Sequence, residues 1–460
     1  MLHLAPSLDR VLREFDAAGF RALVVGGAIR DALLGLDPKD FDIEVYGVSY
    51  DRLAQILGKH GRVDLVGKSF GVVKLEGHDF SVPRRDSKTG AHHRDFETTF
   101  DPAITPKEAA SRRDFTINAM AFDPVSRELL DFFGGRDDLQ NRILRATSEA
   151  FSEDPLRVLR GMQFTCRFDL QLDPATAQMA RSISDQYPTI ATERIAEEFN
   201  KWALKSTKPG LLGPYLLETG WLPHFPEIER LRGVPQDPEW HPEGDAWTHT
   251  MHVLNAAARV AEREQCEGDD RAVLMYAALT HDFAKAEVTA LRERGGALRW
   301  SSYGHEHAGV PLARRFLERI GIKNSVIEQV LPLVESHMAH TNMQGDVTPR
   351  AVRRLATRLA PASITQLLRL IEADASGRPP KPPGLPDSAQ KLRDVAAAHA
   401  VHHNPPVPLI LGRHVLPYFD DQPGKQIGEV TRAAYEAQLD GAFSNEAEAL
   451  TWLDNYFRNP

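Results

Sequence analysis

The chain has 460 residues, 42% of them apolar and 26% charged, which is ordinary for a globular protein of about three domains and excludes a collagen-like or mostly disordered chain. Its 55 Lys and Arg against 64 Asp and Glu give a net charge of −9, so contacts with RNA would depend on local basic patches. Two cysteines exclude a disulfide framework, and the sequence shows no run of about 18 apolar residues and no signal-like N-terminus, so we expect a cytoplasmic protein without a membrane span.

The first part of the chain alternates short strands with helices. Residues 1–20 place apolar side chains at helical spacing, and the apolar run at 22–25 predicts a buried strand. Gly26 and Gly27 interrupt that run before a helical pattern resumes at 28–34. Further strands are predicted at 41–46, 63–66 and 72–75.

The rest of the chain is predicted to be helical after one long loop. Residues 84–111 are polar and of mixed charge, which predicts a mobile loop. From residue 146 onward the pattern stays helical, including 245–376, so we expect an α+β protein. Its expected parts are an N-terminal mixed domain at 1–145, a helical neck and body at 146–238, a histidine-rich helical domain at 239–378, a Pro-rich linker at 379–408 and a helical C-terminal segment at 409–460. The C-terminal segment either binds RNA or caps the domain before it, and we favour the structural role.

Two aspartates follow the glycine pair on the second predicted strand. Asp40 and Asp42 are two positions apart, so on a strand their side chains point to the same face. Adjacent carboxylates repel each other, and divalent cations such as Mg²⁺, which prefer oxygen ligands, relieve that repulsion. Gly26 and Gly27 let the backbone approach a ligand closely, and the helix opening with Arg30 favours a triphosphate. Together these residues predict a site for Mg²⁺ and a nucleotide.

The stretch from Gly26 to Asp42 closely resembles the first motif of the class II tRNA nucleotidyltransferases, the family of CCA-adding enzymes and bacterial poly(A) polymerases. Asp79, just before the polar loop, matches a third acidic residue of that family. The resemblance implies a polymerase-beta-like head with a small mixed sheet, followed by an all-α neck and body. Four further stretches resemble the later motifs of the family in the same order: 112–119, 131–139, 153–157 and 193–197, the last thought to brace the one before it.

This resemblance implies a phosphoryl transfer in which the 3′-hydroxyl of an RNA attacks the α-phosphate of a nucleoside triphosphate and pyrophosphate leaves. Asp40, Asp42 and Asp79 would be the catalytic carboxylates, and Asp40 and Asp42 would hold Mg²⁺. Arg113 and Asp114 resemble the pair that recognises the sugar hydroxyls. Gly26, Gly27 and Arg30 would bind the nucleotide with them.

Asp154 and Arg157 match the nucleotide-selecting motif and are three apart on a predicted helix, with Arg160 continuing the same face. Cytosine and adenine both present an amino donor beside a ring-nitrogen acceptor, whereas uracil and guanine present the reverse. A carboxylate only accepts and a guanidinium only donates, so this pair would select C and A without a nucleic-acid template. Gln163 stands where many relatives carry arginine, so one contact is expected to differ.

Histidines and aspartates punctuate the helices of the second half, a combination that suits divalent transition metals. The adjacent His281 and Asp282 resemble the naming motif of HD phosphohydrolase domains, with Lys285 placed to contact a phosphate. His305 and His307 compete for one place, and the sequence context favours His305. The expected ligands of this second metal site are His249, His281, Asp282, His305, His337 and Asp374.

The sequence therefore predicts a template-independent enzyme that adds CCA to the 3′ end of tRNA from CTP and ATP. Its HD domain is predicted to hydrolyse phosphate esters or 2′,3′-cyclic phosphates. A poly(A) polymerase and an enzyme that adds only the final A stay open as alternatives, and the full-length loop at 84–111 favours addition of that A. An alternative of another class is an HD phosphohydrolase with a degenerate nucleotidyltransferase domain. A protein-modifying uridylyltransferase fuses the same folds but is not expected to carry the Asp154–Arg157 pair.

Overall fold

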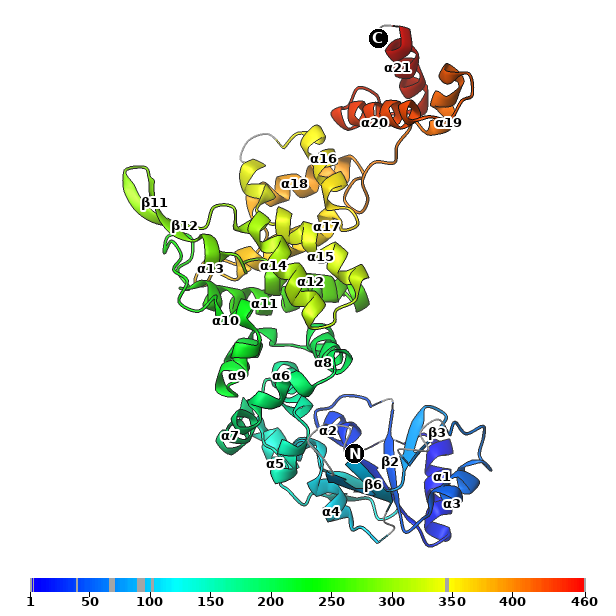
Figure 1. Ribbon diagram of the computed structural model, residues 1–460. Helices are drawn as coiled ribbons and strands as arrows, with labels where there is room; N and C mark the ends of the chain where they lie inside the picture. Colours follow the sequence, from blue (N-terminus) through cyan, green and yellow to red (C-terminus); the bar gives the residue numbers. More distant parts are fainter. Residues whose placement is uncertain are drawn as a thin grey trace. The chain divides into compact units, whose positions relative to one another are not determined.

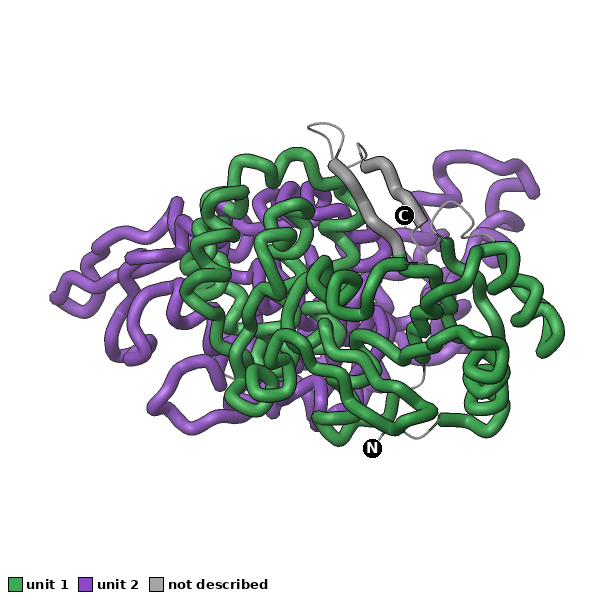
Figure 2. Tube along the Cα trace, turned by 90° about the horizontal axis from the view of Figure 1, so that it is seen from below, with its two compact units in different colours: residues 1–225 green, residues 226–460 purple. Residues whose placement is uncertain are grey.

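The computed structural model describes residues 2, 4–38, 40–65, 71–88, 96–100, 103–343 and 347–458. The chain divides into two compact units, Met1–Phe225 (unit 1) and Pro226–Pro460 (unit 2), which Figure 2 colours green and purple. Within the described ranges, every helix is too short or too polar to cross a bilayer.

Unit 1 contains a six-stranded mixed sheet (Figure 1). Within this sheet β2 and β4 are parallel, and the other neighbouring strands are antiparallel. This small sheet, followed by helices, confirms the predicted α+β class. In their order across the sheet, the strands are β3 (Val72–Leu75), β4 (His78–Ser81), β2 (Asp42–Tyr46), β1 (Arg21–Val25), β7 (Ala121–Asp123) and β8 (Glu128–Leu130).

Strand β1 is buried on both faces because its side chains are continuously apolar. Val24 packs on one face in a core shared with α1 (Pro6–Ala17) and α3 (Tyr50–Leu57). Leu23 and Val25 pack in a second cluster on the opposite face. The strand and the amphipathic helix before it were both predicted, and α2 (Gly27–Leu33) begins directly after β1 at the glycine pair.

The segment 84–111, predicted as a loop, contains regular structure, so that prediction was wrong. β5 (Arg84–Lys88) and β6 (Phe96–Phe100) form an antiparallel pair, and α4 (Pro106–Ser111) follows. The prediction of a loop was based on polarity alone and overlooked two local signals of regular structure. The sequence of β6 holds two aromatic and two β-branched residues, which favour a strand, and the side chain of Thr105 caps the first turn of α4 in a capping box.

The strand predicted at 63–66 is reduced, in its described part, to a single bridge between Asp64 and Lys74. Asp64 and Leu65 are both exposed, so the run has no buried face to extend the pairing. Val66 lies outside the described residues.

The remainder of unit 1 is helical, as predicted from residue 146 onward. Helices α6 and α8 pack against each other through fully buried side chains such as Met162 and Phe199. A short parallel pair, β9 (Ile143–Leu144) and β10 (Gln171–Leu172), precedes and follows α6. The helices are α5 (Gly135–Gln140), α6 (Leu156–Phe168), α7 (Pro174–Ser182), α8 (Thr192–Lys205) and α9 (Leu212–Glu218).

Unit 2 is mainly helical, with α11 packed against both α12 and α17. The proline-rich segment 379–408 holds a packed helix, α18, whose Leu392 is fully buried, between its two proline clusters. The C-terminal helices α19 to α21 share a small apolar core of their own. The helices of unit 2 are α10 (Pro226–Glu229), α11 (Ala246–Arg263), α12 (Gly268–Thr280), α13 (Lys285–Val288), α14 (His305–Arg319), α15 (Asn324–Ser336), α16 (Pro349–Leu359), α17 (Ile364–Ser376), α18 (Asp387–Ala398), α19 (Gly412–Val415), α20 (Lys425–Asp440) and α21 (Glu446–Arg458).

One β-hairpin interrupts the region 245–376, which was predicted to be helical throughout. β11 (Ala290–Arg294) and β12 (Ala297–Ser301) are antiparallel and are joined by Gly295 and Gly296. Both glycines have positive φ, 60° and 77°, as a two-residue type I′ turn requires. The Gly-Gly pair between two short polar runs was the sequence signal for this hairpin.

Candidate functional site

Two of the predicted catalytic carboxylates lie side by side at one edge of the sheet of unit 1. Asp42 begins β2 and pairs in register with Asp79 on the parallel strand β4. It also pairs with Val25, the last residue of β1, so the turn at Gly26 opens at the same edge. Asp40 lies two residues earlier, in the exposed segment that leads into β2.

The charges around Asp42 favour a bound cation. Partial burial raises the pKa of Asp42 above its usual value, Arg113 opposes this, and the nearby carboxylates of Asp79 and Glu44 raise it further. Repulsion between carboxylates is relieved by a divalent cation, and oxygen atoms are the ligands that Mg²⁺ prefers. The side chains at this edge therefore fit the predicted Mg²⁺.

Glu44 belongs to this site, although the sequence reasoning missed it. Its carboxylate lies 2.6 Å from the guanidinium of Arg113 and accepts a hydrogen bond of 2.6 Å from the hydroxyl of Tyr46. Gly26 borders the same guanidinium: its φ is 76°, and a Cβ there would lie 2.8 Å from Nη1 of Arg113. The alternation of acidic residues that begins at Asp40 continues to Glu44, which was the available signal.

Arg30, predicted to contact phosphates, is occupied by protein groups. It is only 5% exposed and donates to Asn118 at 2.5 Å and to Asp31 at 2.7 Å. Its guanidinium also lies over the ring of Phe168, 4.7 Å from the centroid. A Cβ at Gly27 would lie 3.3 Å from Nη2 of Arg30. The structure thus uses Arg30 to join α2 to α6.

Asp114, predicted to recognise a sugar hydroxyl, is buried in a polar network. Its Oδ1 accepts hydrogen bonds from the backbone N–H of Phe115 and from Asn118, and its Oδ2 accepts one of 2.8 Å from Arg160. Burial alone would raise the pKa of Asp114, but Arg160 and Asn118 hold it below its usual value. Arg160 also lies 3.8 Å from the buried Glu198 of α8, a residue that the sequence reasoning missed.

Asp154 precedes α6, which corrects the prediction that it shares a helical face with Arg157. Its backbone is extended, because the residue before a proline, here Pro155, is disfavoured in the helical region. The carboxylate lies 2.8 Å from the guanidinium of Arg194 on α8. The last predicted motif therefore does contact the one that it was expected to brace.

Arg157 lies in the first turn of α6, and backbone carbonyls of other segments fix its guanidinium. Two of its N–H groups donate to the carbonyls of Ala150 and Arg112, at 2.6 and 2.7 Å. Gln163, the departure from the family pattern, is buried and accepts a hydrogen bond of 3.1 Å from Arg167. Arg157 is thus fixed next to Asp154 without pairing to it directly.

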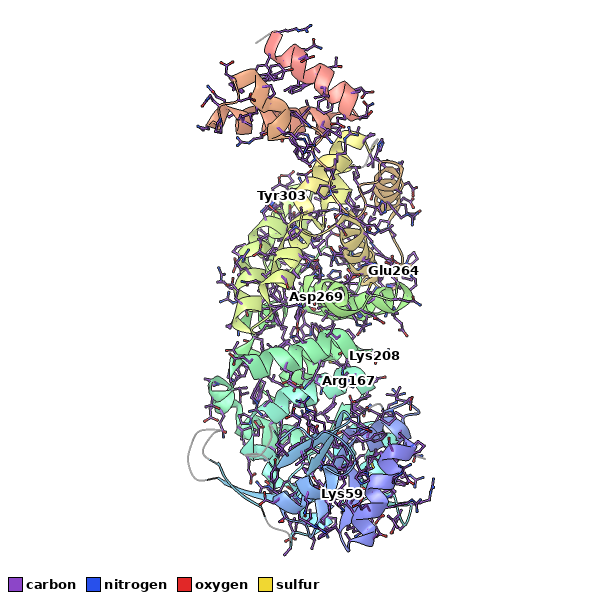
Figure 3. All side chains as sticks on the ribbon, turned by 90° about the vertical axis from the view of Figure 1, so that its right-hand side faces the viewer. Lys59, Arg167, Lys208, Glu264, Asp269 and Tyr303 are labelled. Carbon is purple, nitrogen blue, oxygen red and sulfur yellow. The ribbon has the colours of Figure 1, made fainter. Side chains whose placement is uncertain are left out.

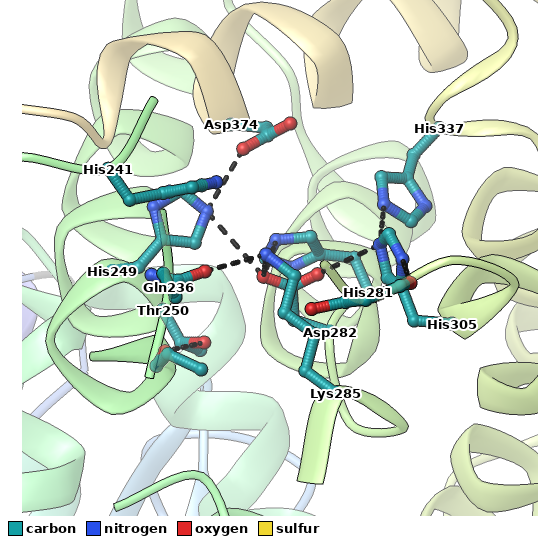
Figure 4. Close-up of polar contacts among 12 residues, drawn as sticks. Gln236, His241, His249, Thr250, His281, Asp282, Lys285, His305, His337 and Asp374 are labelled. Carbon is teal, nitrogen blue, oxygen red and sulfur yellow. Dashed lines mark hydrogen bonds and ion pairs between the residues drawn. The ribbon is translucent and has the colours of Figure 1, made fainter. Parts of the chain in front are cut away.

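In unit 2, the residues predicted to bind a second metal converge from separate helices into one buried cluster (Figure 4). Asp282 joins its two halves: one of its oxygens lies 3.1 Å from Nε2 of His281 and the other 3.2 Å from Nε2 of His305. Among the described residues, Nε2 of His281 and Oδ1 of Asp282 are buried without a hydrogen bond, which metal coordination would satisfy. The predicted ligands form two groups, and within each group the ligand atoms all lie within 4.8 Å of one another. One group is His249, His281 and Asp374, and the other is Asp282, His305 and His337.

Three of the four clustered imidazoles are oriented by the backbone. His281, His305 and His337 each place Nδ1 at 2.9, 2.7 and 2.7 Å from the carbonyl oxygen three residues earlier in the chain. A carbonyl only accepts, so each Nδ1 carries the proton and each Nε2 is left with its lone pair facing the cluster. Burial, reinforced by His305, lowers the pKa of His337 to about 3, so it is neutral at pH 7.

His249 is oriented by a carboxylate that the sequence reasoning missed. Oε1 of Glu243 lies 2.8 Å from Nδ1 of His249 and accepts a hydrogen bond of 2.8 Å from His241. The Glu243 side chain is fully buried, and the two imidazoles lower its pKa to about 2 in spite of that burial. A carboxylate behind a metal-binding imidazole is a recurring arrangement. In the sequence, the run His241-Pro242-Glu243 was interpreted only as marking a boundary between domains.

Two cations border the cluster. Nζ of Lys285 lies 2.7 Å from Asp282, and Arg378 contacts Asp374 at 2.7 Å. Burial would raise the pKa of Asp374, but Arg378 holds it well below its usual value. By contrast, His307 is at the surface with 69% of its side chain exposed, outside the cluster that contains His305. A buried metal site flanked by cations suits a phosphate substrate.

The comparisons with known proteins match both parts of the chain in which these residues lie. Residues 22–145 match the model of the poly A polymerase head domain, and residues 246–375 match that of the HD domain. The multifunctional CCA protein of Vibrio parahaemolyticus is 34% identical over 369 residues, covering 77% of this chain and 85% of that protein. The multifunctional CCA protein of Xanthomonas campestris pv. campestris is 35% identical over 368 residues, with the same coverage.

Solved structures show the same fold. The CCA-adding enzyme of Bacillus stearothermophilus in complex with CTP has a TM-score of 0.66 and 21% identity, covering 99% of this chain and 98% of that one. The CCA-adding enzyme of Thermotoga maritima complexed with tRNA has a TM-score of 0.58 and 20% identity, covering 99% and 96%.

Proposed function

The chain belongs to the multifunctional CCA protein family, and we propose that it adds C, C and A to the 3′ end of tRNA from CTP and ATP, without a nucleic-acid template. The observation that carries this proposal is the carboxylate pair Asp42–Asp79 at the sheet edge, beside the ion pair of Arg113 and Glu44. A protein that only bound RNA would gain nothing from clustered carboxylates, whereas phosphoryl transfer requires the cations that they hold.

In the proposed reaction, the 3′-oxygen of the RNA forms a bond to the α-phosphorus of the nucleotide while the bond to pyrophosphate breaks. Asp40, Asp42 and Asp79 would hold Mg²⁺, which supplies charge neutralisation and a more acidic 3′-hydroxyl when bound. Arg113 borders the turn at Gly26, where the triphosphate is expected, and Glu44 fixes its guanidinium. The protein contributes position and charge rather than covalent chemistry.

Nucleotide selection is proposed to depend on Asp154 and Arg157, with Arg160 and Asp114 nearby. Asp154 accepts from the amino group of cytosine or adenine, and Arg157 donates to the ring nitrogen beside it. Arg157 gives two of its five donors to backbone carbonyls, so it retains N–H groups for a base. Uracil and guanine leave both side chains unpaired, and unpaired polar groups give strong discrimination.

Arg194→Ala is expected to relax this selection. The change removes the partner that holds Asp154, so the carboxylate loses its fixed direction. Because a hydrogen bond to a charged group contributes about 1.5–3 kcal/mol, we expect discrimination between CTP and UTP to fall at least about tenfold. The measurement is the ratio of kcat/KM for the two nucleotides on tRNA that lacks CCA.

Arg142→Ala is the matched control, since Arg142 forms an exposed ion pair with Asp169 in the same unit. It should leave the ratio unchanged. An unaltered ratio in Arg194→Ala would show that Arg194 does not position Asp154.

The buried cluster of unit 2 supports a second proposed activity, hydrolysis of phosphate monoesters or 2′,3′-cyclic phosphates at RNA ends. His249, His281, Asp282 and Asp374 would hold one divalent transition metal, and His305 and His337 with Asp282 a second. Such metals, when bound, supply Lewis acidity toward a phosphate and lower the pKa of water. Lys285 is placed to pair with a phosphate oxygen, since its ammonium lies at the cluster beside Asp282.

Glu243→Gln is expected to weaken metal binding at this cluster. The amide keeps the shape of the side chain but loses the charge that orients His249, and loss of such a partner costs about 10- to 100-fold in metal affinity. The measurement is bound metal against free Mn²⁺ or Ni²⁺ in the full-length protein. Glu335→Gln, beside the exposed His307, is the control. Equal affinities in the two variants would remove Glu243 from the site.

The experiment that tests the main function is nucleotide addition to three RNAs with Mg²⁺: tRNA lacking CCA, tRNA ending in CC, and an oligo(A) primer. Growth of the first substrate to CCA, and no further, supports the proposal. Growth only from CC would indicate an A-adding enzyme, and long tails on oligo(A) would indicate a poly(A) polymerase. No addition would leave the HD domain as the working part.

A further inference from the structure

The hairpin β11–β12 projects from the helices of unit 2 (Figure 1). Its two strands of five residues reach about 17 Å, and nothing in the proposed reactions uses it. Residues 290–303, which include it, carry three arginines and one glutamate, a net charge of +2 in a chain of net charge −9. Arg299 is paired with Asp237 and Glu239, so the positive charge that this hairpin offers to RNA is that of Arg292 and Arg294.

The register of the hairpin separates its side chains by chemistry. Arg292 pairs with Arg299 and Arg294 with Ala297, so the arginines share one face. The opposite face carries Leu291, Leu298 and Trp300, together with Glu293, which pairs with Leu298. In the described part of the chain, neither Arg292 nor Arg294 has an acidic partner within ion-pair distance, and both are exposed.

An aromatic ring accompanies the arginine face. Tyr303, labelled in Figure 3, has 79% of its surface exposed. The guanidinium of Arg292 lies 5.9 Å from the centroid of its ring. Exposed rings next to arginines are the elements by which proteins bind single-stranded nucleic acid, with bases stacking on the ring and phosphates meeting the cations.

The base of the hairpin is fixed next to the buried cluster of unit 2. Its two ends are joined by a hydrogen bond of 2.8 Å between Thr289 and Ser302, and the carbonyl of Ser302 is the one that orients the ligand His305. Arg299 forms ion pairs with Asp237 and Glu239, next to Gln236, which accepts a hydrogen bond of 2.8 Å from Lys285. The base of the hairpin is therefore linked to the cluster of unit 2 through Ser302 and His305.

We propose that the arginine face of β11–β12 and Tyr303 bind the last nucleotides of a single-stranded RNA 3′ end whose terminal phosphate is held at the metal cluster. The inference rests on the proposed phosphohydrolase activity and adds to it the surface that binds the RNA next to its terminal phosphate. Arg292 and Arg294 bind backbone phosphates, and Tyr303 stacks on a base.

The test compares hydrolysis of two substrates by the full-length protein: a short single-stranded RNA ending in a 2′,3′-cyclic phosphate, and 2′,3′-cyclic AMP. In the double variant Arg292→Ala, Arg294→Ala, KM for the RNA rises about tenfold with kcat unchanged, and kinetics on the mononucleotide stay the same. Because the variant no longer neutralises two RNA phosphates, the slope of log KM against log salt concentration falls by about 1.4, at about 0.7 for each phosphate. Tyr303→Ala also raises KM for the RNA, and Tyr303→Phe restores it, because the ring alone stacks.

Arg358→Ala, an exposed arginine at the end of α16, is the matched control and leaves both substrates unaffected. Unchanged KM for the RNA in the double variant overturns the inference, and so does an equal loss on both substrates. A raised KM for the RNA in Leu298→Ser alone would assign binding to the apolar face and also overturn it. If the unaltered protein hydrolyses neither substrate, the phosphohydrolase proposal fails, and this inference fails with it.

Discussion

Asp42→Ala is expected to lower nucleotide addition by about a thousandfold or more and to leave phosphate-ester hydrolysis unchanged. Asp42 is the carboxylate that faces both Asp79 and the glycine turn, so its loss removes a proposed Mg²⁺ ligand. Bound metals supply several kcal/mol of transition-state stabilisation, and each 1.4 kcal/mol or so changes a rate tenfold. The measurement is kcat for CTP addition to tRNA lacking CCA, beside hydrolysis of a 2′,3′-cyclic phosphate by the same preparation.

Asp42→Asn separates charge from shape, because the amide keeps the volume of the side chain and removes the negative charge. It should match Asp42→Ala in activity. Asp51→Ala, an exposed acidic residue in the first turn of α3, is the control and should add nucleotides normally. Loss of both activities in Asp42→Ala would contradict two independent sites.

His281→Ala is expected to produce the opposite result, with hydrolysis lowered by about a thousandfold and nucleotide addition retained. His281 contributes a buried Nε2 to one group of ligand atoms and lies 3.1 Å from the bridging Asp282. Without it the metals lose a ligand, and the several kcal/mol that they supply to hydrolysis are lost with them. The measurement is kcat for the cyclic phosphate together with the metal content of the protein.

His307→Ala is the matched control for this variant, because His307 lies close in sequence to His305 but its side chain is exposed. It should hydrolyse normally. Since His281 is fully buried in unit 2, a thermal unfolding curve of His281→Ala, compared with that of the unaltered protein, tests that unit 2 still folds. Hydrolysis retained in His281→Ala would contradict the metal assignment.

The sequence predicted most clearly those features that depend on local pattern. The apolar run of β1, the alternation of β2 and the amphipathic α1 follow from side-chain periodicity, and all three are present. The family resemblance assigned Asp42 and Asp79 to the same catalytic site. The structure adds that they pair in register on neighbouring parallel strands.

The remaining features depend on contacts between segments that no single stretch encodes. Arg30 was assigned to phosphate from its position after the glycines, and neither stretch of sequence indicates its hydrogen bond to Asn118, which lies 88 residues away. Glu243 was overlooked although it lies only six residues before His249, because its role shows only once the start of α11 turns Nδ1 of His249 toward it. The hairpin β11–β12 is different: its Gly-Gly turn was a local signal, and the strong helical pattern on both sides concealed it.

The backbone carbonyls that hold His281, His305 and His337 have a consequence for how the HD domain responds to its metal. Each carbonyl belongs to the same stretch of chain as its histidine, and the helices that carry the ligands are packed through apolar cores of their own. The ordering of the ligands is therefore achieved by folding itself, unlike in small zinc domains, where metal binding and folding are one event. The domain is then expected to stay folded when a chelator removes its metal, while hydrolysis, which requires the metal, is lost.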